Sequence, residues 1–269
     1  MGPTNCTLGP TLLKIDNVCL SYGDKVVLKN VNAEIREILR NQSKGQVLGF
    51  LGPSGVGKTQ LFRIIAGLNK PTSGQVTLNG GTPVHPGLVG VVAQNYLLFE
   101  HRTVLSNLML AARRKNHTQT EVGAYLEEFS LHDVRHHYPA QLSGGQRQRV
   151  AILQQILCSS HFLLMDEPFS GLDLLMLEKT AALIQKVANM DELNTIVIVS
   201  HDVTAVASVS DHIWMLGRDR DAEGNIIPGA RIMEVYDLVE RDLCWHPDII
   251  TSPRFMSFVA EVKERFRTL

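Results

Sequence analysis

A glycine-rich segment followed by a lysine and a threonine is the most chemically specific feature of the sequence. Residues 52–59 read Gly-Pro-Ser-Gly-Val-Gly-Lys-Thr. The strand-like run Gln46 to Leu51 precedes them, and Gln60 to Ala66 follows with the apolar spacing of a helix face. Between a strand and a helix this pattern binds phosphate, because backbone N–H groups and the helix N-terminus face the anion. The segment predicts a nucleoside triphosphate site.

The residues predicted to contact the nucleotide are Gly52, Pro53, Ser54, Gly55, Val56, Gly57, Lys58, Thr59 and Gln60. Lys58 would place a positive charge on the β- and γ-phosphates, and the hydroxyl of Thr59 would ligate a Mg²⁺ ion that bridges them. The competing interpretation is a glycine-rich turn that matches by chance. The strand before the loop and the helix after it argue against that interpretation.

Two adjacent carboxylates follow a second apolar run. Phe162 to Met165 predicts a buried strand, and Asp166 and Glu167 come directly after it. Ligands collect at the carboxyl ends of parallel strands. Asp166 is predicted to hold Mg²⁺ through water, and Glu167 to orient or deprotonate an attacking water as a general base. The competing interpretation is an exposed acidic pair at the end of a strand.

The elements that must position these residues form an α/β pattern. Phe162 to Met165 and Ile196 to Val199 flank a helical pattern at Leu174 to Val187, as expected of buried parallel strands. Leu12 to Ile15 and Val26 to Leu28, around a turn at residues 21–24, predict an antiparallel sheet near the start. Further strands are predicted at Val76 to Leu78, Gly90 to Val92, Ile213 to Leu216 and Arg231 to Val235. Helices are predicted at Leu105 to Ala112, Glu121 to Phe129 and Gln146 to Leu157, as an inserted helical subdomain.

Composition excludes several classes of protein. The 269 residues are 44% hydrophobic and 20% charged, which are values typical of a globular chain. With 26 Lys and Arg against 27 Asp and Glu, the net charge is −1, so no global field attracts nucleic acid or anionic lipid. The four cysteines form no C-x-x-C pair, and we expect no secretory signal and no membrane span. These features predict a cytoplasmic protein that recognises its nucleotide locally.

A further motif carries a family resemblance. Leu142-Ser143-Gly144-Gly145-Gln146 resembles the signature motif of the ATP-binding cassette (ABC) ATPases and precedes Asp166 by a separation normal for that family. The resemblance implies a head-to-tail dimer, either a homodimer or a pair with another ABC subunit. In it, Ser143, Gly144, Gly145 and Gln146 close over ATP held by the partner.

Four more family elements occur in the family's order. Tyr22 matches the aromatic residue that stacks on adenine, and Gln94 matches the glutamine that reaches Mg²⁺ and the attacking water. Residues 170–173 resemble the loop that contacts the other subunit, and His201 resembles the histidine that contacts the γ-phosphate. The resemblance therefore implies Glu167, His201 and Gln94 as catalytic residues, and Thr59, Gln94 and Asp166 as metal ligands.

The fold implied by the resemblance is a P-loop NTPase ABC cassette. It has a RecA-like core sheet, an N-terminal antiparallel β subdomain and an inserted helical subdomain. We expect an ABC ATPase domain over residues 1–217, with the helical subdomain at about 96–160. Residues 218–269 are expected to add a hairpin and a helix packed on the same domain, with an exposed hairpin loop at 218–225. The connection at 36–45 is longer than usual and is expected to be an exposed excursion.

The function implied is that of an ATP-binding and ATP-hydrolysing subunit at the cytoplasmic face of the cell membrane, working with separate transmembrane permease subunits. Residues 95–108 resemble bacterial importers that receive substrate from a solute-binding protein. An exporter or lipid-transfer ATPase has the same motor, so it stays open as an alternative. So does a soluble ABC ATPase acting on nucleic acid, although no nucleic acid partner is expected. The transported substrate, and the roles of the 36–45 connection and of the C-terminal extension, are not encoded in these motifs.

Overall fold

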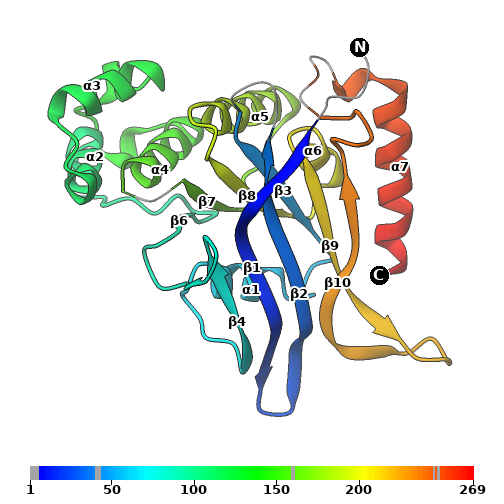
Figure 1. The fold of residues 1–269 in the computed structure, drawn as a ribbon. Helices are drawn as coiled ribbons and strands as arrows, with labels where there is room; N and C mark the ends of the chain where they lie inside the picture. Colours follow the sequence, from blue (N-terminus) through cyan, green and yellow to red (C-terminus); the bar gives the residue numbers. More distant parts are fainter. Residues whose placement is uncertain (1–5, 40–43, 159–160, 245, 247–248) are drawn as a thin grey trace.

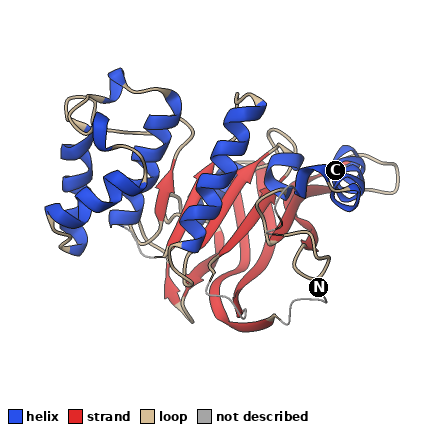
Figure 2. Cartoon of the chain, turned by 90° about the horizontal axis from the view of Figure 1, so that it is seen from above, coloured by secondary structure: helices blue, strands red, loops and turns tan. Residues whose placement is uncertain are grey.

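A single sheet organises the chain in the computed structural model, which describes residues 6–39, 44–158, 161–244, 246 and 249–269. Within these residues the sheet has ten strands in the order β5-β4-β1-β2-β10-β9-β3-β8-β7-β6 (Figure 1). Helices cover the sheet and extend beyond its β6 edge (Figure 2). Each described helix is too short or too polar to cross a bilayer. The α/β class predicted from the sequence is confirmed.

The parallel strands predicted for the core lie side by side. β3 (Gln46–Leu51) pairs in parallel with β8 (Thr195–Ser200) and β9 (His212–Arg220). β8 pairs with β7 (Phe162–Asp166), which pairs with β6 (Gly90–Val92). Every residue of β3 and of β8 is buried. Because the strands run in parallel, their carboxyl ends meet at one edge of the sheet.

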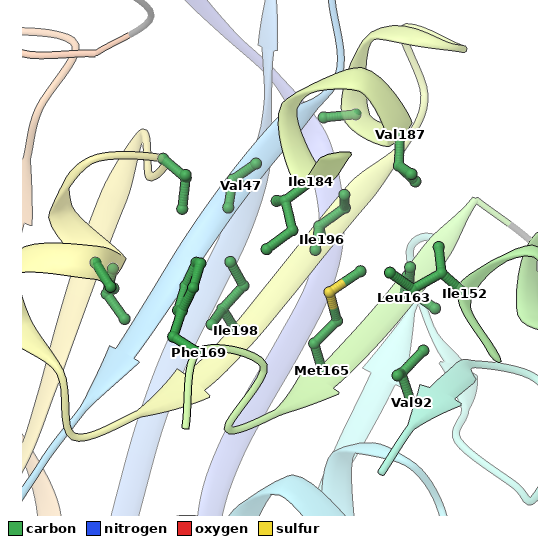
Figure 3. Close-up of a cluster of buried hydrophobic side chains, with 14 of the residues drawn as sticks. Val47, Val92, Ile152, Leu163, Met165, Phe169, Ile184, Val187, Ile196 and Ile198 are labelled. Carbon is green, nitrogen blue, oxygen red and sulfur yellow. The ribbon is translucent and has the colours of Figure 1, made fainter. Parts of the chain in front are cut away.

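Alternate residues of these strands enter two separate hydrophobic clusters. Leu163, Met165, Ile196 and Ile198 face the cluster beneath the large helices (Figure 3). Among the helices that contribute to it are α4 (Gly144–Cys158), α5 (Leu174–Asn189), α6 (Val203–Ala207) and α7 (Pro253–Thr268). The strand residues between these four face the other cluster, which contains α1 (Lys58–Ile65). The continuous apolar runs in the sequence reflect this burial on both faces.

The two antiparallel strands predicted near the start of the chain extend beyond the apolar runs from which they were predicted. β1 (Thr7–Tyr22) and β2 (Lys25–Leu39) form a hairpin whose last pair is Tyr22 and Lys25. β4 (Ser73–Leu78) pairs with β1, and β5 (Thr82–Pro83) pairs with β4. The exposed excursion expected at 36–45 is wrong for Arg36 to Leu39, which belong to β2, where Leu39 pairs with Thr7. Residues 40–43 lie outside the described residues.

The three helices predicted between β6 and β7 form a group beyond the edge of the sheet. They are α2 (Val104–Ala112), α3 (Gln119–Glu128) and α4, with the short 3-10 turns η1 (Arg113–Lys115), η2 (His132–Val134) and η3 (Pro139–Gln141). Thr103 and Thr118 cap the first two helices by accepting hydrogen bonds from the backbone N–H groups of Ser106 and Glu121. Figure 1 shows this group to the left of β6 and β7.

The C-terminal part continues the same sheet. β10 (Ile226–Asp237) pairs with β9, so the boundary expected at residue 217 falls inside β9. The expected loop at 218–225 is too long, because β9 continues through Arg220 and the turn is confined to 221–225. Asp221 holds that turn: its carboxylate accepts from the backbone N–H groups of Glu223 and Asn225 at 3.1 and 2.7 Å. After η4 (Ile249–Thr251), α7 buries the predicted apolar stripe, with Phe255 and Phe258 in the core.

Candidate functional site

The phosphate loop lies at the carboxyl end of β3 and leads directly into α1. Gly55 and Gly57 have φ values of 75° and 121°, which L side chains rarely adopt. At Gly52 a Cβ atom would lie 2.7 Å from the carbonyl oxygen of Leu216. Glycine is therefore required at Gly52 for close packing against β9, and at Gly55 and Gly57 for the curl of the loop.

Lys58 is held against this loop. Its side chain is 8% exposed, and Nζ donates hydrogen bonds to the carbonyl oxygens of Gly52 at 2.6 Å and Pro53 at 3.1 Å. Burial lowers the pKa of the Lys58 ammonium, while the carboxylates of Glu167 and Asp166 oppose that shift. The positive charge is thus kept inside the loop, where a phosphate would replace the carbonyl partners.

A cavity of about 300 Å³ opens beside the loop. It is lined by Tyr22, Lys25, Val26, Val27, Gly55, Gly57, Lys58, Thr59, Gln60 and Arg218. Tyr22 is 53% exposed at this cavity. Its hydroxyl donates to Oε1 of Gln60 at 2.9 Å and accepts from Nδ2 of Asn69 at 3.0 Å. The ring is tethered by its polar end, which leaves an aromatic surface for a base.

The two carboxylates predicted from the sequence lie at the end of β7. Asp166 ends this strand, and β8 separates it from β3, which leads to Thr59. Burial raises the pKa of Asp166, the Glu167 carboxylate raises it further, and Lys58 opposes both. Ionisation of the Asp166 carboxyl therefore costs free energy, and a nearby cation would lower that cost.

Glu167 is strained and held by three neighbours. Its φ is 50°, and its N–H donates to the carbonyl of Val199 at 2.8 Å. Its carboxylate accepts from the hydroxyl of Ser200 at 2.7 Å, and Nδ1 of His201 lies 3.0 Å from both carboxylate oxygens. A left-handed backbone at a non-glycine residue costs about 1 to 3 kcal/mol, which the surrounding contacts must offset. The structure thus brings together Glu167 and His201, two of the three residues predicted to be catalytic.

Gln94 lies in the exposed turn after β6. Its Nε2 donates to the hydroxyl of Ser170 at 3.4 Å, which places Gln94 at the 170–173 loop. Asp173, the last residue of this loop, caps α5 by accepting from the N–H of Met176 at 2.8 Å. Gln94, predicted to reach Mg²⁺ and the attacking water, is therefore adjacent to the loop predicted to contact the other subunit.

The signature residues occupy the start of α4, away from the cavity. The hydroxyl of Ser143 accepts from the N–H of Gln146 at 3.3 Å, and Oε1 of Gln146 accepts from the N–H of Ser143 at 2.9 Å. This reciprocal capping box fixes the helix N-terminus. Gly144 is exposed and faces open space. Ser143 to Gln146 do not line the cavity beside Lys58.

Three residues of this region were missed by sequence reasoning. Ser200 bonds Glu167, Asn69 bonds Tyr22, and Nη2 of Arg218 donates to the carbonyl of Gly55 at 2.9 Å. Ser200 could have been found from its place between a buried strand and His201. Nothing in the sequence predicts that Arg218, rather than Arg220, reaches the phosphate loop. That difference depends on where β9 passes the loop in the folded chain.

The chemistry of the predicted metal ligands fits magnesium. Thr59, Gln94 and Asp166 offer a hydroxyl, an amide and one carboxylate, all with oxygen donors. No group of three or more His, Cys, Asp or Glu side chains in the described part of the chain could hold a metal by itself. A set with few protein charges suits a Mg²⁺ ion that arrives with nucleotide phosphates.

One prediction about stability follows from Asp166. A carboxyl whose pKa is raised in the folded state destabilises the fold above that pKa, and the penalty fades as the pH falls toward the unfolded value. Replacement by the neutral isostere, Asp166→Asn, should therefore raise the unfolding temperature at neutral pH without nucleotide, and the gain should shrink on acidification. Thermal unfolding at several pH values checks this. Equal stabilities of the two proteins at neutral pH would contradict it.

Comparisons with known proteins agree with this geometry. Residues 35–170 match the family described as ABC transporter. The chain is 34% identical over 256 residues to the sulfate/thiosulfate import ATP-binding protein CysA of Synechocystis, covering 92% of this chain and 65% of that protein. It is 33% identical to the spermidine/putrescine import ATP-binding protein PotA of Spiroplasma citri, covering 96% of this chain and 72% of that one. The chain thus spans about two thirds of the length of these relatives.

Solved structures share the fold. A cbiO1 structure from Clostridium perfringens, part of the ABC transporter complex cbiONQ, superposes with a TM-score of 0.71 at 22% identity, covering 95% of this chain and 96% of that one. The ATP-binding cassette MJ0796, as a dimer bound to ADP and Pi in a post-hydrolysis state, gives a TM-score of 0.67 at 27% identity, covering 84% of this chain and 99% of that one.

This chain belongs to the ABC transporter family. The class of protein predicted from the signature and phosphate-loop motifs, an ABC ATPase resembling import subunits, is confirmed, and so is the cassette fold.

Proposed function

We propose that this chain is the ATP-binding and ATP-hydrolysing subunit of an ABC importer. One observation carries the proposal: the structure combines a buried lysine in a phosphate loop, Lys58, with a candidate general base, Glu167, held at the end of β7. Glu167 accepts from Ser200 at 2.7 Å and lies 3.0 Å from Nδ1 of His201. A carboxylate held in this position is suited to accept a proton from an attacking water, which supports hydrolysis rather than ATP binding alone.

Binding of the nucleotide falls to the loop and the cavity beside it. Lys58 and the N–H groups of the loop balance the charge of the β- and γ-phosphates, and the Tyr22 ring offers a stacking surface to the adenine. A bound Mg²⁺, held by Thr59, Gln94 and Asp166, would neutralise charge that develops on the phosphates. Asp166 would then keep its carboxylate ionised despite burial.

Hydrolysis requires that a water be aligned and relieved of a proton. Oε1 and Oε2 of Glu167 are the proton acceptors, and the Ser200 hydroxyl fixes one of them at 2.7 Å. Since Nδ1 of His201 lies against the same carboxylate, Nε2 is the ring nitrogen left to face the γ-phosphate. Glu167, directly after β7, would therefore act together with Ser200 and His201 at the end of β8.

The complete site needs a second subunit. Ser143 to Gln146 cap α4 and stand apart from the cavity beside Lys58 in the same chain. In the proposed homodimer, or in a pair with another ABC subunit, these N–H groups close on ATP bound to the partner. Residues 218–269 are proposed to extend the ATPase domain, and 96–160 to form its helical subdomain.

Import is favoured over export because the relatives at 34% and 33% identity are named import ATP-binding proteins. One of them is named for the anions sulfate and thiosulfate, and the other for the polycations spermidine and putrescine. Similar cassettes therefore belong to systems named for cargoes of opposite charge, so the cassette does not select the charge of the cargo. We assign that specificity to the permease and solute-binding subunits. The ATPase would work at the cytoplasmic face of the membrane, where ATP is available.

Recovery of partners tests the proposal. The tagged chain, purified in mild detergent from the membranes of its own cells, should bring with it a polytopic membrane protein, identified by mass spectrometry. A solute-binding protein in the same complex would support import and reveal the cargo. The tagged Lys58→Ala variant is the control for assembly, and recovery of the same partners with it would show that docking does not depend on ATP binding. Nucleic acid or ribosomal proteins as the sole partners would contradict the transporter.

A further inference from the structure

The cavity beside the phosphate loop is strongly cationic. Its lining includes Lys25, Lys58 and Arg218 and contains no carboxylate. Lys58 belongs to the predicted phosphate loop and Lys25 lies near Tyr22, whereas Arg218 comes from β9, far along the sequence. A cavity with this charge favours a polyanion, and the guanidinium of Arg218 adds to its field.

The β9–β10 hairpin is packed so that Arg218 reaches the loop. β10 meets β2 at the parallel pair Ala230 and Leu28. Close approach depends on Gly229, where a Cβ atom would lie 2.6 Å from Cβ of Lys29. Across the hairpin, Ala230 pairs with Arg218, which fixes Arg218 beside the part of β2 that lines the cavity.

A bidentate ion pair links the two strands of the hairpin next to Arg218. The guanidinium of Arg231 on β10 donates to both carboxylate oxygens of Asp219 on β9, at 2.7 and 2.8 Å. The neighbouring acid is therefore already neutralised and is not available to Arg218. Such fork-to-fork pairs fix orientation as well as charge.

The guanidinium of Arg218 keeps most of its donors. Nη2 donates to the carbonyl of Gly55 at 2.9 Å. Within the described part of the chain Arg218 forms no ion pair, in contrast to Arg231, Arg241 and Arg265. A guanidinium has five N–H donors, so a single carbonyl leaves the charge and several donors facing the cavity.

We propose that Arg218 is a nucleotide-binding residue that supplies a second cation, beside Lys58, to the polyphosphate of the bound nucleotide. The proposal rests on the proposed function, because it names a further contact of the same site. A positive charge from the C-terminal hairpin would also couple that hairpin to nucleotide occupancy, since the contact exists only while phosphate is bound.

Binding of a non-hydrolysable ATP analogue with Mg²⁺, measured by calorimetry at low and high salt, tests the proposal. Arg218→Gln should weaken binding about tenfold at low salt, the equivalent of one charge-assisted hydrogen bond. The loss should shrink at high salt, because ions screen the charge. Arg218→Lys keeps the charge and should restore most of the affinity.

Arg220→Gln is the matched control. Arg220 lies two residues further along β9, so it is on the same face of the strand, and its side chain donates to the carbonyl of Gly224 instead. This variant should bind like the unmodified chain. Unfolding temperatures of all variants check that each is folded, and Arg218→Lys gives the comparison if Arg218→Gln is unstable.

Two results would overturn the inference alone. One is equal binding by Arg218→Gln and Arg220→Gln. The other is an equal loss in Arg218→Gln and Arg218→Lys that does not depend on salt, because Arg218 would then only brace Gly55. Failure of the unmodified chain to bind the analogue, with affinity no better than that of Lys58→Ala, would instead contradict the proposed function itself.

Discussion

Glu167→Gln should reduce ATP turnover by a factor of about 100 to 10,000, the range typical of losing a general base. The amide keeps the shape of the side chain, and its oxygen can still accept from Ser200, which donates at 2.7 Å in the structure. No phosphate contact is removed. Phosphate release by the purified chain measures the loss, and nucleotide binding should stay at the normal level.

The same variant should accumulate as an ATP-bound dimer. Closure of Ser143 to Gln146 over the partner's nucleotide is expected to last until the γ-phosphate is cleaved, so a protein that binds but does not hydrolyse remains closed. Size-exclusion chromatography with Mg²⁺ and ATP should show a dimer for Glu167→Gln and mostly monomer for the unmodified chain. Hydrolysis at the normal rate would exclude Glu167 as the base.

Two companion variants separate the base from its surroundings. Ser200→Ala removes one hydrogen bond to the carboxylate but keeps the base, so its turnover should fall only about tenfold. Glu240→Gln changes an exposed carboxylate that follows β10 and does not line the cavity. It should hydrolyse ATP normally, and a loss there would indicate a general charge effect.

The phosphate loop and the carboxylate pair could be predicted because each lies at the end of a strand that the neighbouring residues in the sequence indicate. An apolar strand, a glycine-rich turn and a helix occur within residues 46–66, and the glycines at Gly55 and Gly57 have the positive φ that the curl requires. The boundaries of β3 were predicted to the residue. Local patterns suffice wherever neighbours in sequence are neighbours in space.

The rest depends on contacts between distant segments. Arg218 reaches Gly55 only because β9 lies next to β3 and β10 pairs in parallel with β2 at Ala230, and no local pattern specifies either pairing. The predicted lengths of β1 and β2 were too short for a related reason. Arg36 and Glu37 are charged and Leu39 is exposed, but all three extend β2 with the buried Ile38, because backbone pairing with β1 continues to Leu39. Long-range pairing, rather than propensity, decided these positions.

Lys58→Ala should abolish ATP binding at concentrations that saturate the unmodified chain. The ammonium lies 2.6 and 3.1 Å from carbonyl oxygens of the loop, so it is already positioned for phosphate. Loss of two charge-assisted hydrogen bonds corresponds to about 100-fold or more in affinity. Calorimetric titration with the non-hydrolysable analogue measures this, and hydrolysis should be lost as a consequence.

The controls for Lys58 distinguish charge from packing. Lys58→Met keeps an unbranched stem in the buried position, so it should fold like the unmodified chain and still fail to bind. Lys70→Ala changes an exposed lysine beyond the end of α1 and should bind normally. Unchanged affinity in Lys58→Met would show that the loop N–H groups suffice and that Lys58 has no binding role.

The buried position of Lys58 also predicts a pH dependence. Burial lowers the pKa of its ammonium below the ordinary value of 10.5, so the free protein loses this charge at a lower pH than an exposed lysine does. Bound phosphate favours the charged form and raises the pKa again. Affinity should therefore be constant on the acidic side of the free-protein pKa and should decline as the pH rises through it. In Lys58→Met this decline should be absent, and a decline of equal size there would assign it to another group.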